Sequence, residues 1–411
     1  MRSGLRIGSV FGIPFYLHPT WFIILALFTL AKAVYWQERF PEWGTAMAWG
    51  TGLAASLLLF SSVLLHELGH SLVALSQGIQ VNSISLFLFG GVAAIERESK
   101  TPGQAFQVAI AGPGVSFALF LLLTGILSLL PETTSPMRIL AENLASVNLI
   151  LCLFNLIPGL PLDGGQVLKA AVWKWTGNRF TAVRVAAKTG QFLGVVTVAL
   201  GAIAFGFAGT GGLWIAFIGW FIFRNASAYD RLSRLQEVLL QTTINEAKSK
   251  GFRVIDARMS LGDFVGKYLL SSWDSNGKRQ DTYPYYAASE GRYRGAIAIE
   301  KIREMERSAW ETEPVASIVL SFDDIPTVTE KMSLAAAIDR LERDRLDYLT
   351  VLSPAGAVAG VVDRGDIVET VANKLGIALP KTEIDRVKSE GTYPTGLPLN
   401  VIAKATIAEE S

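Results

Sequence analysis

The first 225 residues alternate long apolar stretches with short polar connections. Stretches long enough to cross a bilayer as helices, about 20 residues each, cover residues 15–35, 46–76, 105–130, 143–172 and 188–224. The last is too long for one crossing, and the glycines within residues 206–212 divide it into two. The pattern predicts a polytopic α-helical membrane protein with about six transmembrane helices.

The basic residues predict how these helices are oriented. They gather before the first span and after the second, fourth and sixth: Arg2, Arg6, Arg97, Lys100, Lys174, Arg179, Arg184, Lys188, Arg224, Arg231 and Arg234. The alternate connections hold only Arg39 and Arg138. Because cytoplasmic connections are enriched in Lys and Arg, we expect a multi-pass protein of the cell membrane with both termini in the cytoplasm.

From about Asp230 the sequence is charged and contains an internal repeat. Residues 254–265 resemble residues 328–338. Each copy predicts a short strand, a serine-capped turn and an amphipathic helix, followed by two strands and another helix. We predict a transmembrane domain over residues 1–229, a cytoplasmic α/β repeat pair over 237–375 and a C-terminal tail over 376–411.

Composition narrows the function classes. Half of the 411 residues are hydrophobic, and the formal net charge is only +1, so the chain lacks the basic field of a nucleic-acid-binding protein. Cys152 is the one cysteine, which excludes an intrachain disulfide and a cysteine-built zinc site. No small-residue cleavage site follows Arg6, so we expect a retained first span rather than a removed signal peptide.

One apolar stretch contains the pattern His-Glu-x-x-His. On a helix, His66 and His70 lie four residues apart on one face, where both imidazoles can bind one ion while Glu67 lies beside them. Ionisable groups at membrane depth are costly and are functional by default. The alternative is a histidine pair that only packs against neighbouring helices.

Catalytic zinc requires a third protein ligand and an open position. Asp163 is the only acidic residue between Glu142 and Asp230. It lies about 20 residues into its stretch, as His66 does, and the two stretches run in the same direction, so we expect similar depths. Asp163 could instead cap a helix end beside Gly164, and His18 is the other candidate ligand.

The HELGH motif and the later run from Asn155 through Pro158 and Pro161 to Asp163 resemble the site-2 protease family of intramembrane metalloproteases. The resemblance covers about residues 1–225. It implies one zinc ion per chain held by His66, His70 and Asp163, with Glu67 as general base. It also implies single-pass transmembrane proteins as substrates.

In that family, residues matching Asn155 and Pro161 position the substrate. The alternating segment Val81–Ile95 predicts a hairpin near the site, which the resemblance makes an edge for an unwound substrate; a merely structural connection is the alternative. The sequence Gly112-Pro113-Gly114 predicts a break or kink in the third span.

The tandem repeat resembles a pair of cystathionine-β-synthase-type (CBS) domains. The resemblance implies a homodimer through the pair and adenine nucleotide as ligand, with Asp366 matching the carboxylate that binds ribose hydroxyls. Asp363 replaces the usual Ser or Thr, and the first copy lacks the acid, so at most one nucleotide site remains. A pure dimerisation module is the alternative.

Two functions follow from these features. The first is a protease that cuts membrane-bound regulators, with nucleotide binding to the CBS pair regulating the cleavage. The second is a non-proteolytic membrane sensor with a structural metal and a nucleotide-binding CBS pair. Glu67 favours the protease, because a structural site needs no base beside its ligands.

Overall fold

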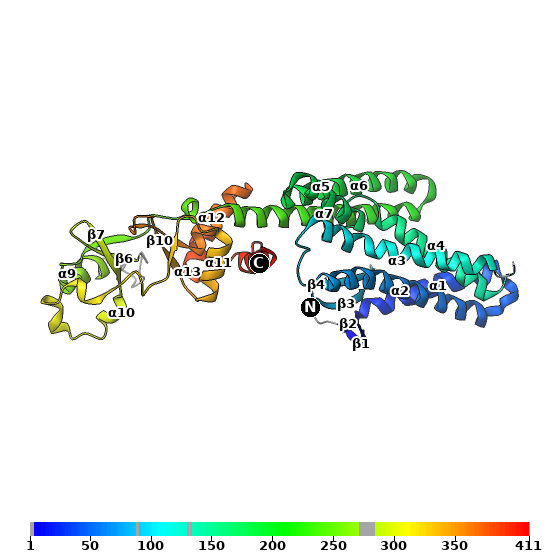
Figure 1. Ribbon diagram of the computed structural model, residues 1–411, viewed down its shortest axis with the longest axis horizontal. Helices are drawn as coiled ribbons and strands as arrows, with labels where there is room; N and C mark the ends of the chain where they lie inside the picture. The colour runs from blue at the N-terminus through cyan, green and yellow to red at the C-terminus, as the bar shows by residue number, and fades with distance from the viewer. Residues whose placement is uncertain (1–3, 88–89, 130, 132–133, 271–283, 411) are drawn as a thin grey trace. The chain divides into compact units, whose positions relative to one another are not determined.

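The computed structural model describes residues 4–87, 90–129, 131, 134–270 and 284–410. The chain divides into two compact units, Met1–Ser233 and Arg234–Ser411 (Figure 1). This division falls between the two predicted domains. Each unit has its own sheets and its own hydrophobic core.

A four-stranded sheet lies at one end of the first unit. Its order is β1-β2-β3-β4, from strands Leu5–Val10, Ile13–Leu17, Val81–Phe87 and Gly90–Ile95. Strands β3 and β4 pair antiparallel, so the predicted hairpin over Val81–Ile95 is confirmed. Strand β2 alternates buried and half-buried residues and pairs parallel to β3. Among the described residues, β4 is an edge strand of this sheet.

Five helices are long and apolar enough to cross a membrane. They are α1 (Pro19–Arg39), α2 (Gly44–Ser76, preceded by the 3-10 turn Pro41–Trp43), α3 (Pro102–Leu129), α4 (Pro136–Asn155) and α6 (Arg179–Ala208). The predicted sixth span lies in α7 (Thr210–Gln241), which is not among the five. Its second half is charged, which makes it less apolar than the others.

The structure corrects two expectations about these spans. The break predicted at Gly112-Pro113-Gly114 is absent, because α3 continues as one helix through Pro113, and a membrane helix tolerates the loss of the one hydrogen bond that a proline removes. The predicted kink at this point stays a prediction. The fourth stretch is not one helix, because α4 ends at Asn155 and α5 covers Asp163–Thr176. Pro158 and Pro161 lie between the two helices. A proline disfavours the helical conformation of the residue before it and has no N–H to donate to a helical hydrogen bond, so the helix ends here.

The second unit contains the predicted repeat. In the first copy, β5 (Arg253–Asp256) pairs parallel to β6 (Tyr285–Ser289), which pairs antiparallel to β7 (Arg292–Ile297). In the second copy, β9 (Thr327–Thr329), β10 (Tyr348–Leu352) and β11 (Val358–Asp363) pair in the same way. The helices α9 (Leu261–Phe264), α10 (Ile299–Ile302), α11 (Leu334–Arg343) and α12 (Arg364–Leu375) follow in matching places.

The remaining elements of this unit are short. They are α8 (Ile244–Ala247), the helical turns Val265–Leu269, Arg307–Glu311 and Val315–Ile318, and strand β8 (Val319–Leu320).

The C-terminal residues differ from the separate tail that the sequence suggests. Helices α13 (Lys381–Glu390) and α14 (Leu399–Glu410) pack on the second copy. Val387, Leu399 and Ala403 are fully buried and belong to its hydrophobic core. Leu399 and Ala403 are four residues apart and therefore lie on one face of α14, which allows this face to pack against the core.

We expect Leu399→Ala to destabilise the second unit, because its side chain is fully buried. Buried Leu→Ala substitutions cost about 2–5 kcal/mol in the free energy of unfolding. Hydrogen exchange of α11 amides in the full chain measures this loss. Val401 on the same helix is 65% exposed, so Val401→Ala is the control that should change little. Equal effects of both would contradict the packing of α14.

Candidate metal centre and active site

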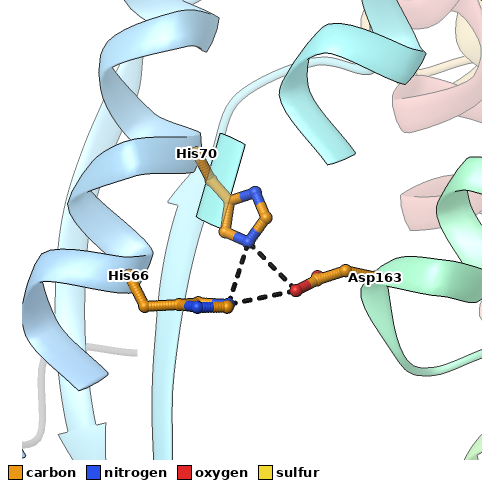
Figure 2. A group of neighbouring side chains, drawn as sticks. All are labelled: His66, His70 and Asp163. Atoms are coloured by element: carbon orange, nitrogen blue, oxygen red, sulfur yellow. Dashed lines mark hydrogen bonds and ion pairs between the residues drawn. The ribbon is translucent and has the colours of Figure 1, made fainter. Parts of the chain in front are cut away.

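Two histidines on α2 supply the first half of the site. His66 and His70 are buried and lie one turn apart, with their Nε2 atoms 3.3 Å from each other. Figure 2 shows both rings turned toward the same point. The helical spacing of the HELGH motif therefore brings the two donor atoms together, as the sequence predicts.

Asp163, the first residue of α5, faces the two rings. Its Oδ2 lies 3.0 Å from Nε2 of His66 and 3.3 Å from Nε2 of His70 (Figure 2). Four ligands arranged tetrahedrally at 2.0–2.1 Å from zinc are about 3.3 Å apart. The three donors thus fit three corners of a zinc site, with a fourth left for water. The alternative role as helix cap does not hold, because the N-cap residue is Leu162.

Helix α3 orients both imidazoles from behind. His70 Nδ1 donates to the carbonyl oxygen of Val108 at 2.6 Å, and His66 Nδ1 lies 2.9 Å from the Ser116 hydroxyl. A carbonyl oxygen can only accept, so Nδ1 of His70 carries the proton and its Nε2 is free to bind metal. The sequence did not predict this role of α3.

Glycines allow this close approach of α2 and α3. A Cβ atom at Gly112 would lie 2.2 Å from His70 Nε2 and 2.7 Å from His66 Nε2. One at Gly69 would lie 2.8 Å from a methyl carbon of Val115. The signal in the sequence was the spacing of Val108, Gly112 and Ser116, four residues apart and therefore on one helix face.

Glu67 lies between the metal ligands and the edge strand β4. A Cβ atom at Gly91 would lie 2.5 Å from Cγ of Glu67, and the Ala93 backbone hydrogen-bonds to the Glu67 carboxyl group. Glu67, the predicted general base, therefore adjoins both the predicted metal and a strand whose outer side is unpaired among the described residues.

The loop before α5 is held by further glycines. Cβ atoms at Gly164 and Gly190 would lie 2.3 Å from the carbonyl oxygen of Leu156 and 2.0 Å from that of Leu160. The Leu160 side chain is fully buried, and its N–H donates to the carbonyl oxygen of Ala186 on α6. This packing fixes the point at which α5 begins, and with it the position of Asp163.

An ion pair joins the end of β4 to α5. Lys169 Nζ donates to Glu98 Oε2 at 3.1 Å, and the Lys169 side chain is buried. Burial raises the pKa of Glu98, but the neighbouring cations Lys169 and Arg179 outweigh it and lower that pKa below its ordinary value. The carboxylate is therefore charged and holds the edge strand near the helix that carries Asp163.

Three other candidates lie outside the metal cluster. Asn155 ends α4, and its amide donates to the Leu151 carbonyl of its own helix. Pro161 lies two residues before Asp163 in the loop. His18 caps the start of α1 through Thr20 and is not one of the three clustered ligands.

Asp366 in the second unit is buried and already bonded. It accepts hydrogen bonds from Lys388 Nζ on α13 at 2.6 Å and from the Ser249 hydroxyl at 3.1 Å. Burial lowers the pKa of Lys388, but the Asp366 and Asp363 carboxylates outweigh it and raise that pKa above its ordinary value. Both carboxylate oxygens of Asp366 are therefore already hydrogen-bonded within the protein.

The fold and the site define a class: a multi-pass membrane protein with a zinc-type His-Glu-x-x-His site completed by an aspartate. Comparison with known proteins agrees, because the profile of peptidase family M50 matches residues 54–136 and 132–200. The Synechocystis sp. protein sll0528, named as a candidate zinc metalloprotease, is 40% identical over 90% of this chain and 96% of its own length. The chain belongs to peptidase family M50, the site-2 protease family, and its cofactor is zinc.

Two solved structures are also similar. The site-2 protease of Methanocaldococcus jannaschii is 28% identical, covers 56% of this chain and 95% of its own, and has a TM-score of 0.42. The CBS domain of a bacterial CNNM/CorC family Mg²⁺ transporter is 19% identical, covers 37% of this chain and 86% of its own, and has a TM-score of 0.27.

We expect Gly112→Ala to abolish zinc binding, because the added methyl group would overlap the donor nitrogens of His66 and His70. Metal content of the purified full-length protein, measured by mass spectrometry, tests this. Gly114→Ala is the matched control, since nothing lies within 4 Å of its Cβ position on the same helix. Normal zinc content in Gly112→Ala would show that α3 does not pack against the ligands.

Proposed function

We propose that this intramembrane metalloprotease hydrolyses peptide bonds in the transmembrane segments of single-pass membrane proteins. The observation that carries the proposal is the place of Glu67, which adjoins the His66–His70–Asp163 cluster on one side and the edge strand β4 on the other. A base, a metal site and a strand edge together suit the hydrolysis of an extended peptide.

The residues divide the work as follows. A zinc ion bound here supplies Lewis acidity to the scissile carbonyl and acidifies water. Glu67 accepts a proton from the attacking water and passes it to the leaving amine. The outer edge of β4 binds the substrate after it unwinds, because an extended chain can add to an unpaired strand.

The topology belongs to the same proposal. We infer six spans, with the apolar half of α7 as the sixth, and both termini and the second unit in the cytoplasm. The distribution of Lys and Arg between connections supports this orientation. Cleavage would then release a cytoplasmic fragment.

The alternative is a membrane sensor whose metal is structural. Structural zinc sites are closed by four protein ligands. Among the described residues, the cluster offers three, with a carboxylate base beside them. Hydrolysis therefore explains the arrangement better than a structural metal does.

The second unit is proposed to pair two copies of the chain and to carry regulation. Adenine nucleotide remains the proposed ligand at Asp366, but only in a state in which α13 has released Lys388. If only a fraction of the molecules is in the state that can bind nucleotide, the apparent Kd is the intrinsic Kd divided by that fraction. The contact between Lys388 and Asp366 would thus set the nucleotide concentration at which the site fills.

We expect Glu67→Gln to keep zinc bound, because the three ligands are unchanged, and to lower cleavage by at least about 10²-fold, as loss of a general base does. The assay uses purified protein with candidate single-pass substrates in liposomes, with and without a zinc chelator. Glu38→Gln, an exposed position on α1, is the control. Cleavage near that of the parent would remove Glu67 from the mechanism.

We expect Lys388→Met to tighten AMP binding by roughly tenfold, because the competing cation is gone. Calorimetry on the full-length protein compares it with Lys381→Met, an exposed position on the same helix. If neither variant nor the parent binds AMP at millimolar concentration, the repeat pair serves dimerisation alone.

A further inference from the structure

A cavity lies within the membrane unit, apart from the metal cluster. It has a volume of about 290 Å³ and is lined by residues of α1, α2 and α4. Both α1 and α4 pack against α2. The cavity is therefore a groove with α1 and α4 as walls and α2 as floor.

The groove runs along α4. Its wall is formed by Asn143, Val147, Ile150, Leu151 and Phe154, whose spacing places them on one face over three turns. From Asn143 to Phe154 the helix rises by eleven residues, or about 16 Å. A groove of this length and apolar lining matches one face of a partner helix.

One end of the groove is polar. Lys32 on α1 and Asn143 on α4 both line it there. The Lys32 ammonium lies 5.6 Å from the centre of the Trp36 ring, and within the described part of the chain no carboxylate pairs with it. A cation inside a membrane span is costly, and it usually pairs with an acid.

The opposite end of the groove leads to the active site. Phe154 is followed by Asn155, at the end of α4. On the floor, Leu59 lies seven residues before His66, about 10 Å along α2. The amide of Asn148 donates to the Ser62 hydroxyl at 2.9 Å, which holds α4 against α2 in this interval.

We propose that this groove docks the still-helical half of the substrate's transmembrane segment, and that Lys32 pairs with an acidic side chain of that helix. The proposal rests on the proposed function. Asn143 lies 12 residues before Asn155, or about 18 Å along α4. The acid should therefore lie about 12 residues from the point at which the substrate unwinds.

A lipid is the other occupant that an apolar groove with a cation could take. Lys32 lies seven residues before the end of α1, and the apolar stretch over residues 15–35 continues for three residues, or about 5 Å, beyond it. The groove extends from this residue toward the end of α4 beside the metal cluster, which suits a substrate segment that must reach the active site better than a lipid.

Photo-crosslinking tests the proposal. Full-length, zinc-loaded Glu67→Gln protein in liposomes carries a benzophenone amino acid at Ile150, which lines the groove and is 65% exposed. The control position is Leu121 on α3, which is 53% exposed and does not line the groove. The probes are two synthetic Leu/Ala transmembrane peptides with an Asn-Gly pair, one with Asp about 12 residues away and one with Leu there.

We expect peptide adducts at Ile150 and not at Leu121, and about tenfold better capture of the Asp peptide, which Lys32→Met removes. Equal adducts at both positions, or only lipid adducts at Ile150, would overturn the proposal, as would equal capture of the two peptides. Parent protein with intact Glu67 is assayed for cleavage in parallel. Cleavage without groove adducts refutes the groove alone, whereas adducts without any cleavage refute the proposed protease.

Discussion

The convergence of three donor atoms to within 3.3 Å of one another constrains the rest of the membrane unit. Two of these atoms belong to α2, and one comes from the start of α5, almost a hundred residues later. Bringing them together requires backbones to pack at distances that a Cβ atom would prevent. Gly112 on α3, Gly164 on α5 and Gly190 on α6 each remove such an obstacle. The geometry of the metal site thus depends on the absence of a side chain at these glycines as well as on the three ligands.

The same constraint places Glu67 relative to a strand edge. Because Gly91 lets β4 pass directly against Glu67, the base lies beside an unpaired strand edge. The ion pair between Glu98 and Lys169 ties that strand to the helix of Asp163. Contacts therefore connect β4 to Glu67 on one side and to the helix of Asp163 on the other. The groove between α1 and α4 approaches this assembly along α2.

The second unit shows a different use of buried charge. Asp366 lies in the core of the second copy, where a lone carboxylate would be costly, and Lys388 and Ser249 satisfy it. The helices that follow residue 375 therefore complete the fold rather than trail from it. A regulator that uses Asp366 must compete with the protein's own lysine.

The sequence alone determined the chemistry: the helical spacing of His66, Glu67 and His70, the single acid available as third ligand, the hairpin over Val81–Ile95 and the repeat in the second unit. These follow from local periodicity, which a sequence displays directly. The sequence did not predict features that depend on packing between segments far apart in the chain. Gly112 and Ser116, for example, have their roles only once α3 packs behind the histidines. The same holds for α14, whose burial depends on the core it covers. Contacts between segments far apart in the chain leave no periodic signal, so only the tertiary structure reveals them.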